Sequence, residues 1–187
     1  MATNVAHRTW NGRKPVTDIL RRRVLPHLLR GPVLLRRQDR AAVVVHYIAA
    51  GSPGRKARFG IGQRYQALTD RYGALPWDQF EMIALLFGGR IVALAEVSRP
   101  RPGDATVWRE ASLSVLPRWR RLGLAERLAR DCLDRVCRRD GQPMVMVVDP
   151  GNGPMRALAL KLGGLPLRTE QGTLYRFDPP APVSAQP

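Results

Sequence analysis

The sequence holds few of the residues that build metal centres or disulfide frameworks. Among its 187 residues there are two cysteines, Cys132 and Cys137, and three histidines. The histidines form no cluster with cysteine or carboxylate at ligand spacing, so a metal site has no support. The cysteines lie five residues apart on a predicted helix and point in different directions, which prevents them from pairing. We therefore expect reduced, partly buried thiols, as in a cytoplasmic protein.

Long hydrophobic runs are also lacking. No segment reaches the roughly 18 uninterrupted apolar residues that a membrane-spanning helix needs, so we expect no membrane partner. Residues 1–14 have no apolar stretch beside their charges and do not resemble a secretory signal. They suit a mitochondrial presequence only loosely, because no amphipathic helix begins before about Val16. The cytoplasm is the expected location.

Acidic residues and lysine are scarce. The chain has 31 Lys and Arg against 15 Asp and Glu, a net charge of +16. The excess lies mainly in residues 1–69, where Asp18 and Asp39 are the only acidic residues. All but three of the basic residues are arginine, and such a bias can come from genome composition, which weakens it as a sign of nucleic-acid binding. We expect nucleic-acid binding to be weak and non-specific.

Hydrophobic patterning is clear in the second part of the chain. The segments "QFEMIALLF" and "RIVALAEVSR" flank Gly88-Gly89, a pair typical of a tight β-hairpin. A third strand, "TVWREASLSVLP", ends at Pro117, and a helix with one apolar stripe is expected over residues 119–139. An apolar strand "PMVMVV", a helix over residues 154–162 and a strand "TLYRF" follow. This order, β-β-β-α-β-α-β, predicts a mixed α/β layer fold.

The first part of the chain gives a weaker pattern. The segment "PVTDILRRRVLPHLLRG" predicts a short helix, interrupted by Pro26 and ended by Gly31. The segment "AAVVVHYIAAG" is either a strand or the start of a second buried segment. The expected organisation is a basic, partly disordered N-terminal segment over residues 1–40, a folded domain over residues 41–178 and a disordered tail over residues 179–187.

The stretch "PRWRRLGLAERL", residues 117–128, combines arginines with small residues at the predicted start of a helix. Helix starts carry unpaired backbone N–H groups and a partial positive charge. Small residues let a ligand approach those N–H groups, and the arginines add positive charge. The stretch therefore predicts an anion site, most plausibly for phosphates.

Two motifs in register give the chain a family resemblance. Arg120-x-x-Gly123-x-Ala125 follows a strand ending Val115-Leu116-Pro117, and it resembles the acetyl-CoA-binding motif of the GNAT superfamily of N-acetyltransferases. The later segment "NGPMRALALKLGG" resembles that family's asparagine followed by a short helix ending in Lys-Leu-Gly. The resemblance implies a GNAT-like acyl-CoA N-acyltransferase fold, an α+β mixed sheet in three layers with a central, mostly antiparallel sheet. It also implies acetyl-CoA as the acyl donor.

The resemblance implies a cofactor-binding set of three parts. The strand before the motif lends backbone groups to the acetyl-pantetheine arm, the loop N–H groups bind the pyrophosphate, and the later asparagine segment completes the site. The residues are Leu113, Ser114 and Val115 of the strand; Arg120, Arg121, Leu122, Gly123, Leu124 and Ala125 of the loop; and Asn152 and Met155 of the later segment.

The sequence departs from the family pattern at the general acid. Many members use a tyrosine in the second helix to protonate the departing thiolate, and that position here is Ala159. The aromatic residue that usually follows Lys-Leu-Gly is replaced by Gly164. A tyrosine acid is therefore not expected from this helix.

Glu110 is the candidate catalytic residue. The stretch "REASLSVLPRWRRLGLA" is similar to one in bacterial protein-lysine acetyltransferases of this superfamily, in which a strand glutamate serves as base. A carboxylate in a partly buried strand can take the proton that an amine loses on attacking a thioester. An ordinary solvent-facing glutamate, paired with Arg109 or another neighbour, is the equal alternative, and Glu96 is the alternative carboxylate.

The function predicted is an acetyl-CoA-dependent N-acetyltransferase in which a primary amine attacks the thioester directly. The acceptor is a protein lysine by preference, with a protein N-terminus or a small amine as alternatives, and the chain is a monomer or homodimer. The rival prediction is a catalytically weak acyl-CoA-binding module whose basic arm binds nucleic acid or an acidic protein.

Overall fold

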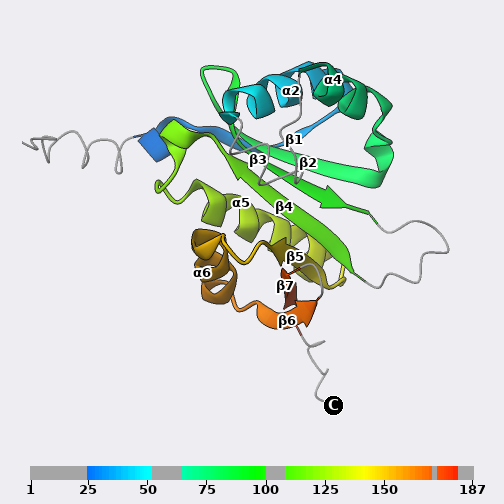
Figure 1. The fold of residues 1–187 in the computed structure, drawn as a ribbon, viewed down its shortest axis with the longest axis vertical. Coiled ribbons are helices and arrows are strands. Elements are labelled where there is room, and N and C mark those ends of the chain that lie inside the picture. The colour runs from blue at the N-terminus through cyan, green and yellow to red at the C-terminus, as the bar shows by residue number, and fades with distance from the viewer. Residues whose placement is uncertain (1–24, 52–64, 100–107, 170–171, 181–187) are drawn as a thin grey trace, which may run out of the picture.

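The computed structural model describes residues 25–51, 65–99, 108–169 and 172–180 (Figure 1). In this part of the chain the strands form one seven-stranded sheet in the order β1-β2-β3-β4-β5-β7-β6. The pair β4–β5 is parallel and the other five pairs are antiparallel. The strands are β1 (Arg30–Leu35), β2 (Phe80–Phe87), β3 (Arg90–Ser98), β4 (Arg109–Val115), β5 (Met144–Val148), β6 (Leu165–Thr169) and β7 (Gly172–Phe177).

Helices cover both faces of the sheet, which gives three layers (Figure 1). Two of them lie on one face, α2 (Arg40–Ala49) and α4 (Tyr65–Ala74). On the other face are α5 (Leu124–Leu133), which continues as a π-helix over Asp134–Arg139, and α6 (Gly153–Lys161). The predicted three-layer, mostly antiparallel mixed sheet is confirmed. Short 3₁₀ turns connect these elements at Leu25–Leu28, Arg37–Asp39, Trp77–Gln79 and Pro117–Trp119.

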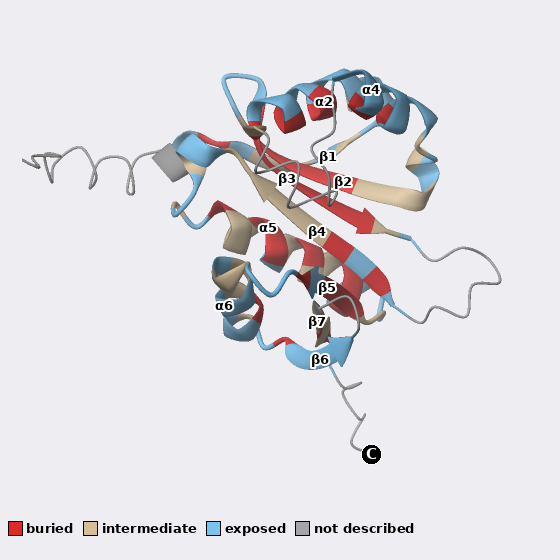
Figure 2. Ribbon diagram, in the orientation of Figure 1, coloured by how far each residue is buried: buried red, intermediate tan, exposed pale blue. Residues whose placement is uncertain are grey.

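Two hydrophobic cores lie on opposite sides of the sheet (Figure 2). Along β2, Ile83 and Leu85 pack toward α5, whereas Met82 and Ala84 pack toward α2 and α4. Successive side chains of a strand point to opposite faces, so a strand covered on both sides must be apolar at every position. This explains the continuous hydrophobic runs of β2 and β3.

Both cysteines are buried and free, as the sequence predicts. Burial raises the pKa of the Cys132 thiol to about 12. At neutral pH this thiol is therefore protonated and chemically inert.

The structure adds β1, α4 and β6 to the predicted order. The segment "AAVVVHYIAAG" forms the helix α2, so the strand interpretation is wrong and the buried segment is a helix. The two added strands contain Pro32 and Pro166, which weakens a strand pattern in sequence. Both strands are edges of the sheet, where the missing proline N–H is tolerated. The predicted helix through Gly31 is wrong at its end, since β1 begins at Arg30, and the sheet thus starts before residue 41. Residues 16–24 of that prediction lie outside the described residues.

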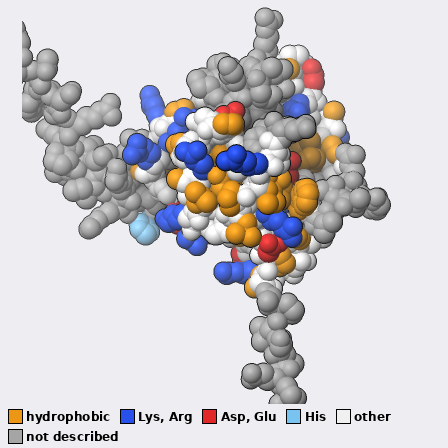
Figure 3. Space-filling view, turned by 60° about the horizontal axis from the view of Figure 1, so that its bottom comes forward, with side chains coloured by type: hydrophobic (Ala, Val, Ile, Leu, Met, Phe, Trp, Pro, Cys, Tyr) orange, Lys and Arg blue, Asp and Glu red, His pale blue; other side chains and the backbone are white. Residues whose placement is uncertain are grey.

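Strand β6 is exposed at every residue. Its leucines Leu165 and Leu167, with Leu160 of α6, are among the exposed large hydrophobic residues of the described chain. Figure 3, in which the bottom of Figure 1 comes forward, shows hydrophobic side chains bordered by Lys and Arg.

Candidate active site

Strands β4 and β5 pair over only two positions and then separate. The pairs are Arg109 with Met144 and Glu110 with Val145, and the Arg109 N–H donates to the Pro143 carbonyl oxygen at 2.9 Å. Glu110 directs its own N–H toward β3, so its bridge to Val145 is made by its neighbours Arg109 and Ala111, and from Ser112 onward β4 has no partner on its β5 side among the described residues. This separation leaves a strand edge whose hydrogen-bonding groups are open.

The direction of the backbone groups along β4 follows from hydrogen bonds at its two ends. Arg109 donates to the β5 side, and Leu116 donates to Val92 of β3 at 3.0 Å. Because neighbouring residues of a strand direct their N–H and C=O groups to opposite sides, Leu113 and Val115 direct theirs away from β3. We call the β5-facing backbone of residues 112–115 the unpaired edge of β4. Apart from the Val115 carbonyl oxygen, which accepts from Arg120, it offers donors and acceptors to an extended, amide-containing ligand.

The loop after β4 has two residues in the left-handed region, Arg121 at φ 63° and Gly123 at φ 78°. These conformations delay the helix predicted from Trp119, and α5 begins at Leu124. A turn of this kind gathers successive N–H groups into a concave anion site. No side chain caps the ten-residue helix α5, so its first N–H groups remain open to a ligand.

At Gly123 the backbone conformation favours glycine, whereas packing against the rest of the protein does not require it. A Cβ atom added there meets no heavy atom within 4 Å, so packing does not require glycine. A positive φ favours glycine, and the bare backbone lets an anion approach. The access of an anion to this backbone stays a prediction.

The side chains of the loop divide into two groups. Leu122 is half-buried and Leu124 is 2% exposed, both against the α5-side core, so these two residues present only backbone groups to a ligand. Arg120 and Arg121 are exposed, and Ala125 is half-buried at the start of α5. One conformational restraint comes from Arg120, whose Nε donates to the Val115 carbonyl oxygen at 3.2 Å.

The later predicted segment begins helix α6. The Asn152 side-chain oxygen accepts a hydrogen bond from the Met155 N–H at 3.2 Å, which caps the helix. Met155 is half-buried against the α5-side core. Lys161 at the other end of α6 contacts Glu126 of α5 at 2.6 Å, and this hydrogen bond, with that from Arg130, holds the pKa of Glu126 below its ordinary value.

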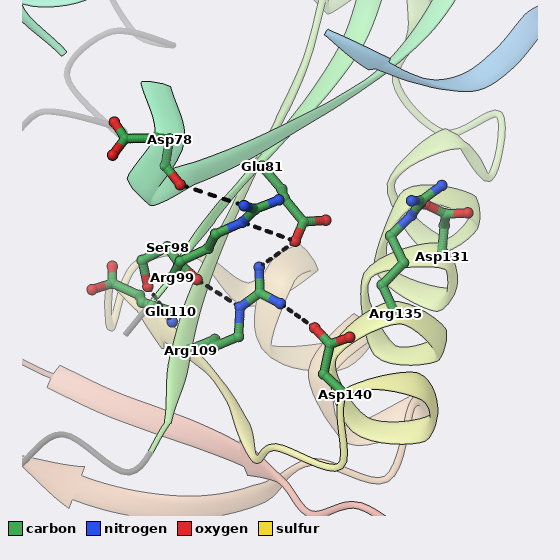
Figure 4. Close-up of polar contacts among 9 residues, drawn as sticks. All are labelled: Asp78, Glu81, Ser98, Arg99, Arg109, Glu110, Asp131, Arg135 and Asp140. Carbon is green, nitrogen blue, oxygen red and sulfur yellow. Dashed lines mark hydrogen bonds and ion pairs between the residues drawn. The ribbon is translucent and has the colours of Figure 1, made fainter. Parts of the chain in front are cut away.

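Glu110 occupies the last paired position of β4 before the strands separate. Its side chain is exposed, and its N–H donates to Ser98 Oγ at 2.8 Å. It forms no ion pair with another described residue. Figure 4 shows its carboxylate directed away from the guanidinium of Arg109. Glu110 is therefore solvent-facing, as the alternative interpretation expects, but Arg109 does not provide its ion pair.

Arg109 instead serves a buried network on the α5 side (Figure 4). Its guanidinium, 3% exposed, contacts Glu81 at 2.8 Å and Asp140 at 2.5 Å, and it donates to the Ser98 carbonyl oxygen at 2.7 Å. Burial alone raises the pKa of Glu81, but the hydrogen bond and charge of Arg109 outweigh it and hold this pKa below its ordinary value. Sequence reasoning missed this network because its members come from separate elements.

The alternative carboxylate, Glu96, lies deep under α2 and α4. It is 3% exposed, and its Oε1 accepts hydrogen bonds from the hydroxyls of Tyr47 and Tyr72, the latter at 2.7 Å. The two tyrosine rings stack with centroids 5.7 Å apart. Opposite Glu96 on β4 is Ser112, whose Oγ is buried without a hydrogen-bond partner among the described residues. Glu96 is therefore a buried acceptor of hydroxyl groups, whereas Glu110 faces the surface.

Ser114 is the predicted strand residue with a side-chain partner. Its hydroxyl lies 2.9 Å from Nε2 of His46 on α2. Side chains on β4 alternate, so those of Glu110, Ser112 and Ser114 share the face covered by α2 and α4. Leu113 and Val115 pack on the α5 side.

The comparisons with known proteins agree with this geometry. A sequence model of the acetyltransferase (GNAT) family matches residues 57–164. The chain belongs to the GNAT acetyltransferase family. It is thus an acetyl-CoA-dependent N-acetyltransferase by family. No curated protein sequence matches the chain at a significant level.

Solved GNAT structures share the fold at low sequence identity. The GNAT domain of S. lividans PAT has 17% identity and a TM-score of 0.64, over 80% of this chain and 89% of that chain. The ribosomal-protein-S18-alanine N-acetyltransferase from Escherichia coli has 16% identity and a TM-score of 0.60, over 82% and 97%. The acetyltransferase yncA from Salmonella typhimurium, solved with acetyl-CoA, has 17% identity and a TM-score of 0.60, over 84% and 96%. At least one solved relative thus contains acetyl-CoA as its cofactor.

Two further features bear on the predicted classes of function. None of the helices in the described ranges is both long and apolar enough to cross a membrane. Within the same ranges, no group of three or more His, Cys, Asp or Glu could hold a metal ion.

Proposed function

We propose that this GNAT protein transfers the acetyl group of acetyl-CoA to a primary amine, with a protein lysine as the favoured acceptor. The observation that carries the proposal is the construction of strand β4. An uncapped helix start with a left-handed loop lies at one end, and Glu110 lies at the other end, where β4 separates from β5.

The acyl donor fits this strand in length and chemistry. The four residues of the unpaired edge of β4 span about 14 Å at roughly 3.4 Å per residue, which suits an extended arm. We assign Leu113, Ser114 and Val115 to that arm, and the loop of residues 120–125 to the pyrophosphate. Asn152 and Met155 complete the site at the start of α6. The positive end of α5 and the exposed arginines favour the phosphates.

In the proposed reaction the amine nitrogen attacks the thioester carbonyl carbon directly. Glu110 accepts the proton that the amine loses, and the C–S bond breaks as coenzyme A leaves as a thiolate. Backbone N–H groups on the unpaired edge of β4 can donate to the thioester oxygen as negative charge develops there. Proton transfer by a positioned carboxylate is typically worth about 10²–10⁴-fold in rate.

Helix α6 supplies no acid for the departing thiolate. Ala159 is fully buried and carries no polar group, so the proposal has no tyrosine acid at this position. A thiolate with an ordinary pKa of about 8.5 leaves readily enough without one. In this proposal the step that needs a catalytic group is therefore deprotonation of the amine, which is assigned to Glu110.

The lysine preference rests on the similarity of residues 109–125 to bacterial protein-lysine acetyltransferases. A panel of acceptors tests it: a lysine peptide with a blocked N-terminus, a lysine-free peptide with a free N-terminus, and a small amine. Coenzyme A release should be fastest with the lysine peptide. Faster release with either of the other acceptors contradicts the lysine preference and leaves amine acetylation intact.

One observation favours a second candidate, the catalytically weak acyl-CoA-binding module with a basic arm. The tyrosine acid used by many relatives is missing at Ala159. In that case the protein binds coenzyme A but releases none with any amine of the panel. Its nucleic-acid binding should then be tight at physiological salt, whereas the enzyme proposal predicts weak binding that falls steeply as salt rises.

A further inference from the structure

A buried histidine connects helix α2 to two strands of the sheet. His46 is 1% exposed, and its Nδ1 lies 3.1 Å from the Ile91 carbonyl oxygen of β3. Its Nε2 lies 2.9 Å from Ser114 Oγ of β4. One imidazole ring thus bridges β3 and β4 from the face opposite α5.

The two partners fix which nitrogen carries the hydrogen. A carbonyl oxygen only accepts, so Nδ1 must donate to Ile91. Burial lowers the pKa of His46 to about 4, so at neutral pH the ring is uncharged and its Nε2 has a free lone pair. Ser114 therefore donates its hydroxyl hydrogen to Nε2. The titratable groups packed nearby are Glu96 of β3 and the tyrosines Tyr47 and Tyr72.

The contact with Ser114 falls where β4 has the least support. Beyond Ala111 the strand has lost β5 as a neighbour, and β3 alone pairs with it among the described residues. Ser114 lies between Leu113 and Val115, whose backbone groups form the unpaired edge. The hydrogen bond between the Ser114 side chain and His46 therefore limits rotation and displacement of this edge.

We propose that His46 is a positioning residue for acetyl-CoA, because its hydrogen bond to Ser114 holds the unpaired edge of β4 in the direction that the acyl arm requires. The inference rests on the proposed function, in which that edge lines the arm. It assigns to α2 a part in donor binding although α2 lies on the face away from α5 and its phosphate loop.

Two substitutions separate the two hydrogen bonds of His46. In His46→Asn, the amide nitrogen can take the place of Nδ1 and keep the bond to Ile91, but nothing reaches Ser114. In His46→Gln, the amide oxygen can reach the place of Nε2 and accept from Ser114. By calorimetry, His46→Asn should bind coenzyme A about fivefold more weakly than the wild type, as for the loss of one hydrogen bond. His46→Gln should stay within about twofold.

The pairing partner gives a second arm of the experiment. Ser114→Ala should weaken coenzyme A binding as much as His46→Asn does. The double variant should bind no more weakly than either single variant, because both remove the same interaction. Val43→Ala is the control: Val43 is fully buried on α2 and packs away from β4, so it should lower the melting temperature and leave the affinity unchanged.

Equal affinities for His46→Asn and His46→Gln overturn the positioning role, as do additive losses in the double variant. If the variants do not fold, nitrogen NMR of the wild-type imidazole decides. We expect hydrogen on Nδ1 and a change in the Nε2 signal when coenzyme A is added. Hydrogen on Nε2, or an unchanged signal, overturns the proposal.

The NMR signals of the Leu113 and Val115 backbone amides distinguish failure of the proposed donor site from failure of the role of His46. Both should shift when coenzyme A binds. If they do not shift, the proposed donor site and the role of His46 fail together. If they shift while His46→Asn binds normally, only the role of His46 fails.

Discussion

Substitution of Gly123 by glutamate tests the phosphate loop most directly, because the structure separates its two effects. The first effect is backbone strain. Gly123 has φ 78°, a region that costs other residues about 1–2 kcal/mol. Since a Cβ meets no heavy atom within 4 Å there, no packing cost adds to it. The melting temperature should fall by roughly 2–8 °C.

The second effect concerns the ligand. A glutamate side chain places bulk and negative charge where the pyrophosphate is proposed to meet the backbone N–H groups of the loop. We expect coenzyme A to bind at least tenfold more weakly, which corresponds to about 1.4 kcal/mol. Titration calorimetry on the folded variant measures this directly.

Gly163 provides the matched control. It has φ 85°, and an added Cβ meets no heavy atom within 4 Å, but it lies after the C-terminal end of α6, outside the residues assigned to coenzyme A. Gly163→Glu should cost similar stability and leave coenzyme A affinity unchanged. An unchanged affinity in Gly123→Glu, or an equal loss in Gly163→Glu, refutes the assignment of the loop.

Three other outcomes are expected. Glu110→Gln should lower kcat by about 10²–10⁴-fold and remove one ionisation from the pH–rate profile while acetyl-CoA affinity is kept; a near wild-type kcat makes this carboxylate structural. Arg121→Gly should be more stable than Arg121→Ala by about 0.5–1 kcal/mol in urea, because only glycine relieves the positive φ; the reverse order contradicts the strain. Arg109→Met should lower the free energy of unfolding by about 2 kcal/mol, because Glu81 loses its buried cation and keeps only the more exposed Arg99. Because Arg109 lowers the pKa of Glu81 from 4.5, the wild type should lose this stabilisation only as the pH falls below that value, and an equal acid sensitivity in Glu81→Gln argues against the pair.

The sequence was sufficient where the signal is local. The Gly88-Gly89 turn, the strand stopped by Pro117 and the fully apolar β5 depend on neighbouring residues, and each appears in the structure. The glycine-containing loop before α5 also appears, while its role at the phosphates stays a prediction. Local rules failed at β1 and β6, because proline hides an edge strand that is stabilised only by its neighbour in the sheet.

The partners of the site residues could not be predicted in this way. His46 and Ser114 are 68 positions apart in the chain, and Tyr47 and Glu96 are 49 apart. No periodicity in one segment specifies which strand a helix residue will face. The available signal was the pair His46 and Tyr47 within an apolar segment. Buried polar groups need hydrogen-bond partners, so this pair indicates polar partners elsewhere in the core without identifying them.

Adjacent side chains of β4 point to opposite faces of the sheet. The structural residue Arg109 and the proposed catalytic residue Glu110 can therefore be neighbours in the sequence. Arg109 points to the α5 side, where Glu81 and Asp140 hold it, and Glu110 necessarily points to the other side. A slip of one residue in register would reverse both directions, leaving a glutamate among the carboxylates of the α5 side and an arginine at the surface. The buried ion pairs therefore oppose such a slip strongly, since an acid beside two acids costs more than a displaced apolar side chain. On this basis the Arg109 network acts at a distance from the proposed reaction. It keeps β4 in the register that directs Glu110 to the face opposite α5, and it leaves the unpaired edge of β4 available to acetyl-CoA.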